Sequence, residues 1–154
     1  MIRSVFVLFM SLANNKRAFY DYEILEKFEA GLVLQGHEVK SAKSGNVSLK
    51  GAYVTITNNG ASLLNAHIGA YAKAGPLPGY DPTRSRPLLV KKRELRYLLG
   101  KTHEQGLTLV PLSMYTQRNL VKLEFAVGRG KKKFDKRESI KEREWKRRKA
   151  QVEN

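Results

Sequence analysis

The chain has 154 residues, of which 42% are hydrophobic, and its 29 Lys and Arg against 14 Asp and Glu leave a net charge of +15. This length suits one ordinary domain and excludes two independent cores, while the charge favours polyanions such as nucleic acid or an anionic membrane surface. The absence of cysteine excludes disulfides, thiol catalysis and a cysteine-based zinc site, and it favours an intracellular, cytoplasmic location.

A short apolar run over residues 5–10 follows the first methionine. Such a run is too short to span a bilayer, which needs about 20 residues. It also falls short of the apolar core of a signal peptide, which has about 7–15 residues. Because Met10 opens an ordinary polar segment, we treat residues 1–13 as an N-terminal extension and expect Met10 to be the true initiator.

The next predicted elements are a strand region and a short helix. Residues 20–28 mix aromatic and branched side chains with charges, and residues 30–34 are small and apolar around Gly31. This pattern predicts two strands or one long bent strand, with Gly31 at a bulge or at a close approach of two backbones. The polar segment 36–44 predicts a short helix that Gly45 ends in a left-handed conformation.

A β-hairpin is the clearest local prediction. Residues 47–49 and 53–57 are typical of strands, and Asn58-Asn59-Gly60 has the composition of a tight turn before a return strand over 62–68. Segment 75–82 is rich in glycine and proline, which predicts an exposed loop of the kind that often carries function.

A helix is predicted after this loop over residues 88–103, and it is expected to end near Gly100 to Gly106. Leu95, Leu98 and Leu99 have the spacing of neighbours on one helix face. Basic side chains lie mostly around the other side, so the helix is amphipathic and its leucines are expected to face the core.

Two further strands are predicted over residues 107–115 and 120–127. In the second, apolar residues alternate with Lys122 and Glu124, so that one face is buried and the other is solvated. With about six short strands and only short helices, residues 14–129 are expected to form a mainly β domain. The expected architecture is an OB-like antiparallel β-barrel with peripheral helices.

Nearly half of the excess charge lies at the C-terminal end. Residues 1–128 have a net charge of +8 and residues 129–154 have +7. This concentration predicts a basic interaction tail over residues 130–154, although a solvated helix face is the alternative. Gly130-Lys131 does not complete a phosphate-binding loop, because Phe125 and Lys132 stand where that motif needs glycine and Ser or Thr.

The tail carries a helix signal of its own. Ser139 and Glu142 match a capping box, so a helix is expected to begin there. The large apolar residues Ile140, Trp145 and Val152 form no continuous stripe, and a helix of about 14 residues without tertiary support is marginal in water. We therefore expect the tail to be largely disordered in the free protein and helical on RNA.

Several motifs together resemble one bacterial family. They are Asn15-Lys16-Arg17-Ala18, FEAGLVLQGHEVKS at 28–41, DPTRSRPLL at 81–89, GKKKFDKR at 130–137 and IKEREW at 140–145. Their order and spacing, from about Asn14 to the end, resemble the SmpB family, the SsrA-binding (tmRNA-binding) proteins of bacteria. The resemblance implies an OB-type barrel that binds the tRNA-like part of tmRNA and brings it to stalled ribosomes in trans-translation. It implies no catalysis, no cofactor and no metal.

The resemblance also implies two sets of contact residues. The set for tmRNA is Asn15, Lys16, Arg17, Glu29, Glu38, Lys40, Leu89, Lys122 and Gly130. The set for the ribosome, in the decoding region and the mRNA channel of the small subunit, is Lys131, Lys132, Lys133, Phe134, Asp135, Lys136, Arg137, Ile140, Trp145, Lys146, Arg147 and Arg148. The expected partners are thus tmRNA and the ribosome, with one monomer per tmRNA and no membrane.

Some of these residues admit more than one role. Glu29 and Glu38 either accept hydrogen bonds from bases or a 2′-hydroxyl, or orient a neighbouring basic side chain, or simply pair with surface lysines. Leu89 either packs against RNA or anchors its loop to the barrel. The family often has histidine where Phe134 stands, which leaves stacking as the role of this ring. It often has a basic residue near Pro87, which predicts one phosphate contact fewer here.

Two other functions compete with this interpretation. A ribosomal or generic single-strand-binding OB protein has the same fold and charge. An enzyme is disfavoured, because His37, His67 and His103 are scattered and neither a metal-ligand spacing nor a nucleophile signature occurs. A peripheral membrane protein needs a basic amphipathic helix with an apolar face, and the tail lacks that face.

Overall fold

The fold is that of a computed structural model, which describes residues 10–152 except for the side chains of residues 133–135. Residues 1–9 lie outside this part, so the assignment of Met10 as initiator stays a prediction. No helix among the described residues has the length and apolar character needed to cross a membrane.

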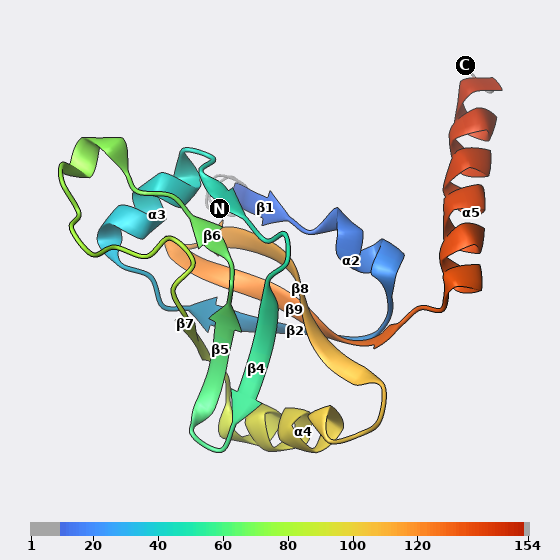
Figure 1. The fold of residues 1–154 in the computed structure, drawn as a ribbon, viewed down its shortest axis with the longest axis horizontal. Coiled ribbons are helices and arrows are strands. Elements are labelled where there is room, and N and C mark those ends of the chain that lie inside the picture. Colours follow the sequence, from blue (N-terminus) through green and yellow to red (C-terminus); the bar gives the residue numbers. More distant parts are fainter. Residues whose placement is uncertain (1–9, 153–154) are drawn as a thin grey trace, which may run out of the picture.

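One antiparallel sheet dominates the described chain, with strand order β1-β8-β9-β2-β7-β5-β4 (Figure 1). Its strands are β1 (Met10–Asn14), β2 (Tyr22–Leu32), β4 (Tyr53–Thr57), β5 (Gly60–Leu64), β7 (Arg86–Leu89), β8 (Leu107–Gln117) and β9 (Leu120–Gly130). A separate small ladder joins β3 (Val47–Ser48) to β6 (His67–Ile68). The predicted mainly β, antiparallel class is confirmed. The sheet curls so that β4 packs against β8, but within residues 10–152 no ladder joins the edge strands β1 and β4.

The helices lie around the sheet. They are α2 (Lys16–Asp21), α3 (Gly36–Lys43), a 3-10 turn (Ala72–Ala74), α4 (Lys92–Thr102) and α5 (Lys133–Val152). The expected helix over 36–44 is confirmed, and Gly45 follows it at a φ of +92°. The short helix α2 was not predicted, because six residues carry too little periodicity to be recognised.

Three predicted boundaries were wrong. The helix expected over 88–103 begins only at Lys92, because residues up to Leu89 belong to β7, in which Arg86 and Leu88 are buried in alternation. Because Arg86 is charged but points inward, the alternation of buried and exposed residues in β7 does not show up as an alternation of apolar and polar residues in the sequence. The return strand expected over 62–68 is split at Asn65, which has a φ of +61° that a strand does not tolerate. The tail helix begins at Lys133 instead of at Ser139, whose hydroxyl accepts a hydrogen bond from Lys131 Nζ at 2.7 Å.

Gly31 sits in one long strand, β2, opposite Leu89 of β7. A Cβ atom placed on Gly31 would lie 3.4 Å from Leu89 Cδ1, which is van der Waals contact with that side chain. The bulge in β2 lies elsewhere, between Ile24 and Glu26. Of the two roles predicted for Gly31, the bulge was wrong, and the atoms nearest to the glycine belong to the Leu89 side chain and not to a second backbone.

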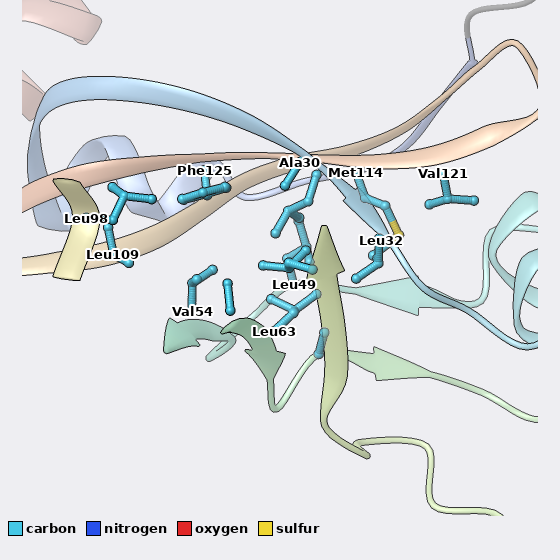
Figure 2. Packing of buried hydrophobic residues seen from close by; sticks show 14 of the residues in the cluster. Ala30, Leu32, Leu49, Val54, Leu63, Leu98, Leu109, Met114, Val121 and Phe125 are labelled. Atoms are coloured by element: carbon cyan, nitrogen blue, oxygen red, sulfur yellow. The ribbon is translucent and has the colours of Figure 1, made fainter. Parts of the chain in front are cut away.

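The core lies on the inner face of the curled sheet (Figure 2). Leu123 and Phe125 of β9 are fully buried, whereas Lys122 and Glu124, which alternate with them, point to the outer face. Leu98 of α4 reaches the same core, which confirms that the leucine face of this helix is buried. Each fully buried side chain of this size contributes about 1.5–3 kcal/mol to folding.

A second, smaller cluster lies on the outer face. Ala18 of α2 packs there on Val110, Leu112 and Ala126 of β8 and β9. Asn15 fixes the start of α2, because its backbone N–H donates to Leu112 O at 2.8 Å and its side-chain amide donates to Pro111 O at 2.9 Å. Helix α2 therefore covers one end of the outer face and leaves the other end open.

Candidate nucleic-acid interface

The open part of the outer face carries a row of four cross-strand partners. Tyr115, Lys122, Gly31 and Leu89 follow one another across β8, β9, β2 and β7. We call these four residues the outer-face row. Leu89 is 68% exposed, which is unusual for a leucine in the interior of a sheet. The side chain lies over Gly31, where the missing Cβ leaves room for it.

Lys122 is paired with Glu29 within this face. Lys122 Nζ lies 2.7 Å from Glu29 Oε1. The hydrogen bond from Lys122 and a further one from Tyr115 hold the pKa of the Glu29 carboxyl below its usual value. Glu29 is thus a carboxylate that fixes the position of a lysine. Of its predicted roles, orientation of a basic side chain is the one that this geometry supports.

The start of α2 adjoins the same face. Asn15 and Lys16 line a shallow hollow together with Phe19, Ser113 and Glu124. Glu124 is the cross-strand partner of Glu29, so this hollow borders the Lys122–Glu29 pair. The structure therefore brings together five of the residues predicted to contact tmRNA, which are Asn15, Lys16, Glu29, Leu89 and Lys122.

Glu38 lies in the interior and cannot touch a ligand directly. Its side chain is 0% exposed and forms ion pairs with Arg84 and with Arg86, the latter at 2.7 Å. Tyr80 Oη lies 3.0 Å from Glu38 Oε2, and the Gln35 N–H donates to Oε1 at 2.9 Å. Burial alone would raise the pKa of this carboxyl, but the hydrogen bonds from Arg84, the Gln35 N–H and Arg86 outweigh it and lower the pKa to about 2.

The position of Glu38 corrects its placement on the RNA face. The motif at 28–41 indicated that Glu38 is important, but a motif does not show whether a side chain points inward. Of the predicted roles, the orientation of basic side chains is the one that the geometry supports. The pairing partners are two arginines, and both come from the segment after the 75–82 loop.

Lys40, Arg17 and Gly130 lie apart from the outer-face row. Lys40 is exposed on α3, which Figure 1 places on the far side of β1 from α2. Arg17 turns toward Asp21, 3.2 Å away, and its guanidinium lies over the Tyr20 ring. Gly130 ends β9 where the chain turns toward α5, and no atom would meet a Cβ placed there.

The base of α5 is held by α2. The Lys131 N–H donates to Asp21 O at 2.9 Å, and Lys136 Nζ lies 3.5 Å from Asp21 Oδ1. Lys136 and Arg143 of α5 each lie 5.8 Å from the centre of the Tyr20 ring, within the range of cation–π attraction. Helix α5 then projects away from the sheet (Figure 1). Tyr20 and Asp21 were not predicted as site residues, and only the short KRAFYD segment could have indicated them.

Most of the residues predicted to contact the ribosome are available on α5 or just before it. Those exposed are Lys132, Arg137, Ile140, Trp145, Lys146, Arg147 and Arg148. Lys131 and Lys136 are half-buried against α2. The side chains of Lys133, Phe134 and Asp135 lie outside the described part, so the stacking role of Phe134 stays a prediction.

Among the described residues no group of three or more His, Asp or Glu side chains is arranged to hold a metal ion. The outer face of the curled sheet carries cations beside exposed apolar side chains, and a basic helix follows the sheet. These are the features of a nucleic-acid-binding module. The family model described as SmpB protein matches residues 12–154. The chain therefore belongs to the SmpB family.

Known proteins similar to this chain carry the corresponding names. The SsrA-binding protein of Trichodesmium erythraeum (strain IMS101) is 52% identical over 136 residues, which are 88% of this chain and 87% of that protein. The SsrA-binding protein of Thiobacillus denitrificans (strain ATCC 25259 / T1) is 48% identical over 143 residues, or 93% and 96% of the two. A solved chain described as "tmRNA-SmpB: a journey to the center of the bacterial ribosome" has a TM-score of 0.65 at 43% identity, covering 82% of this chain and 92% of its own length.

Proposed function

We propose that this protein binds the tRNA-like part of tmRNA and delivers it to stalled ribosomes for trans-translation. The observation that carries the proposal is the outer-face row with Lys16 and Asn15 at its border. Lys122, which Glu29 holds in place, and Lys16 meet phosphates there, and the exposed Leu89 is free to pack on sugar or base. The names of the similar proteins support tmRNA and the ribosome as the partners.

In this proposal, the domain over residues 14–129 selects the RNA. Lys16 and Lys122 neutralise phosphates and release counterions, which provides affinity that falls with salt. Glu29 keeps Lys122 in one position, so less side-chain entropy is lost when RNA binds. Leu89 gains burial that it lacks in the free protein.

The tail over residues 130–154 acts in the ribosome. Its cations contact the decoding region and the vacant mRNA channel of the small subunit, which are lined with RNA. The contacts of Tyr20 and Asp21 with the base of α5 set the direction in which the tail leaves the domain. We further propose that α5 loses much of its helicity in the free protein and regains it on RNA, because no core supports it beyond its first turns.

The protein acts by binding and not by catalysis. The proposal includes a monomer, one for each tmRNA, in the cytoplasm. A competition experiment at near-physiological salt tests it. A transcript of the tRNA-like part of tmRNA should bind more tightly than bulk tRNA or poly(U). Equal affinities for the three RNAs would instead favour a generic single-strand-binding protein.

A further inference from the structure

A groove lies beside α2, where this helix adjoins β4 and the start of β8. It consists of two adjoining hollows, both lined by Asn15, Arg17 and Lys50. The deeper one extends to Tyr53 of β4 and Thr108 of β8 and has a volume of about 360 Å³. We call the space lined by these five residues the edge groove. Lys50, Tyr53 and Thr108 have no part in the proposed function.

The floor of the edge groove is an open strand edge. β1 pairs with β8 only from Ser113 to Thr116, so within residues 10–152 no strand pairs with this edge of β8 before Ser113. Asn15 occupies the carbonyls of Pro111 and Leu112, whereas the stretch around Thr108 lines the groove. An unpaired strand edge presents backbone N–H and C=O groups that are available for hydrogen bonds.

The walls of the groove combine cations with an aromatic ring. Lys50 is exposed and forms no ion pair with any described residue, and the turn that carries it is held by the Asn65 side-chain amide, which donates to Gly51 O at 3.1 Å. Tyr53 is 48% exposed on β4. Arg17 also lines the groove and pairs with Asp21 at 3.2 Å, so Lys50 is the cation of the groove without an ion pair among the described residues.

These groups match a single unpaired nucleotide. A phosphate suits Lys50 and Arg17, a base can stack on the face of a tyrosine, and the base edge can bond to free backbone groups. A duplex presents phosphates but keeps its bases paired, so it would leave the ring and the strand edge unused.

We propose that the edge groove binds one unpaired nucleotide of the RNA that the outer-face row holds. The inference rests on the proposed function, because Asn15 borders both places and a bound RNA must pass around the start of α2 to reach both. Lys50 contacts the phosphate and Tyr53 stacks on the base. The nucleotide belongs to a loop or bulge and not to a stem.

The test uses the full chain and transcripts of the tRNA-like part of tmRNA with 2-aminopurine at one unpaired position at a time. Stacking on a tyrosine quenches this base, so the wild type should quench it at one position and Tyr53→Ala should not. Tyr53→Ala should weaken binding about tenfold, and Tyr53→Phe, which keeps the ring, by no more than about twofold. Lys50→Gln should make the dependence of log affinity on log salt concentration less steep, by the amount that corresponds to about one phosphate contact.

Two variants serve as matched controls. Tyr97→Ala removes an exposed tyrosine on α4, and Lys73→Gln removes an exposed lysine on the 3-10 turn. Both should bind as the wild type does. Thermal unfolding of each variant verifies that losses of binding are not losses of folding.

The inference is overturned if Tyr53→Ala and Lys50→Gln bind like the wild type while a Lys16→Gln, Lys122→Gln double variant loses binding. That result would leave the proposed function intact. Failure of the wild type itself to prefer the tRNA-like transcript over poly(U) would overturn both proposals.

Discussion

Arg86 and Glu38 form an ion pair in which both side chains are 0% exposed, with Arg86 Nη2 at 2.7 Å from Glu38 Oε2. The remaining donors of Arg86 are also used, since Nη1 donates to Ala66 O at 2.7 Å and Nη2 to Pro82 O at 2.9 Å. Burial of two charges is costly, and it is tolerated here because hydrogen bonds satisfy both groups. The pair joins α3 to β7 and to the loop before it.

Glu38→Gln should destabilise the fold without removing an RNA contact. Loss of the carboxylate leaves Arg86 buried without its counter-charge, which costs about 3–5 kcal/mol of unfolding free energy. Urea titration measures this loss. Affinity for the tRNA-like transcript, corrected for the folded fraction, should stay unchanged. A variant with normal stability and abolished binding would contradict the buried role of Glu38.

The same carboxyl predicts how stability depends on pH. Its pKa is about 2 in the folded protein and near 4.5 when unfolded. The unfolded chain therefore binds the proton more readily, so the stabilisation is complete above pH 4.5 and is lost as pH falls toward 2. The loss amounts to about 3 kcal/mol. Urea titrations at several pH values should show this loss in the wild type and a smaller one in Glu38→Gln.

Leu89→Ser should weaken RNA binding and leave stability nearly unchanged. The side chain is 68% exposed, so its removal costs at most about 0.5 kcal/mol of folding free energy. Loss of its burial against RNA should reduce affinity about tenfold. Leu120→Ser is a matched control, because Leu120 is 62% exposed at the β8–β9 turn. Equal RNA affinities of the two variants would show that Leu89 makes no contact with RNA that Leu120 lacks.

Simultaneous replacement of Asp135, Lys136 and Arg137 by alanine should separate the two proposed activities. Binding of the tRNA-like transcript should stay within about twofold of the wild type, because the outer-face row is untouched. Peptide tagging on stalled ribosomes should be lost. Filter binding and an in vitro tagging assay measure the two effects. Loss of both would contradict the division of labour between domain and tail.

The tail should gain helicity when it meets RNA. A peptide of residues 130–154 should show only a small helical signal in far-ultraviolet circular dichroism. The difference between the spectra of the full-length protein and of a protein without these residues should be equally small. Addition of RNA should increase it. A full helical signal without RNA would refute the proposed folding on contact and indicate that α5 is stable alone.

Local periodicity was enough for several elements. The alternation around Lys122 correctly separated the buried from the outer face of β9, because side chains of a strand alternate whatever it pairs with. Asn59 and Gly60 correctly indicated the β4–β5 hairpin, since a tight turn depends on its own backbone angles. The leucines of α4 likewise predicted its buried face. The family motifs indicated that the basic start of α2 and the tail carry contact residues.

Only the tertiary structure decided the partners of the charged residues. Glu38 meets Arg86 across 48 positions and Lys122 meets Glu29 across 93, so nothing local distinguishes the buried carboxylate from the exposed one. The edge groove likewise combines side chains from three separate segments of the chain. The sequence alone thus determined the mainly β class, the faces of its strands and the basic tail, because these follow from neighbours along the chain. Which carboxylate is buried and which cations face a ligand depend on how the sheet curls, because that alone brings distant charges together.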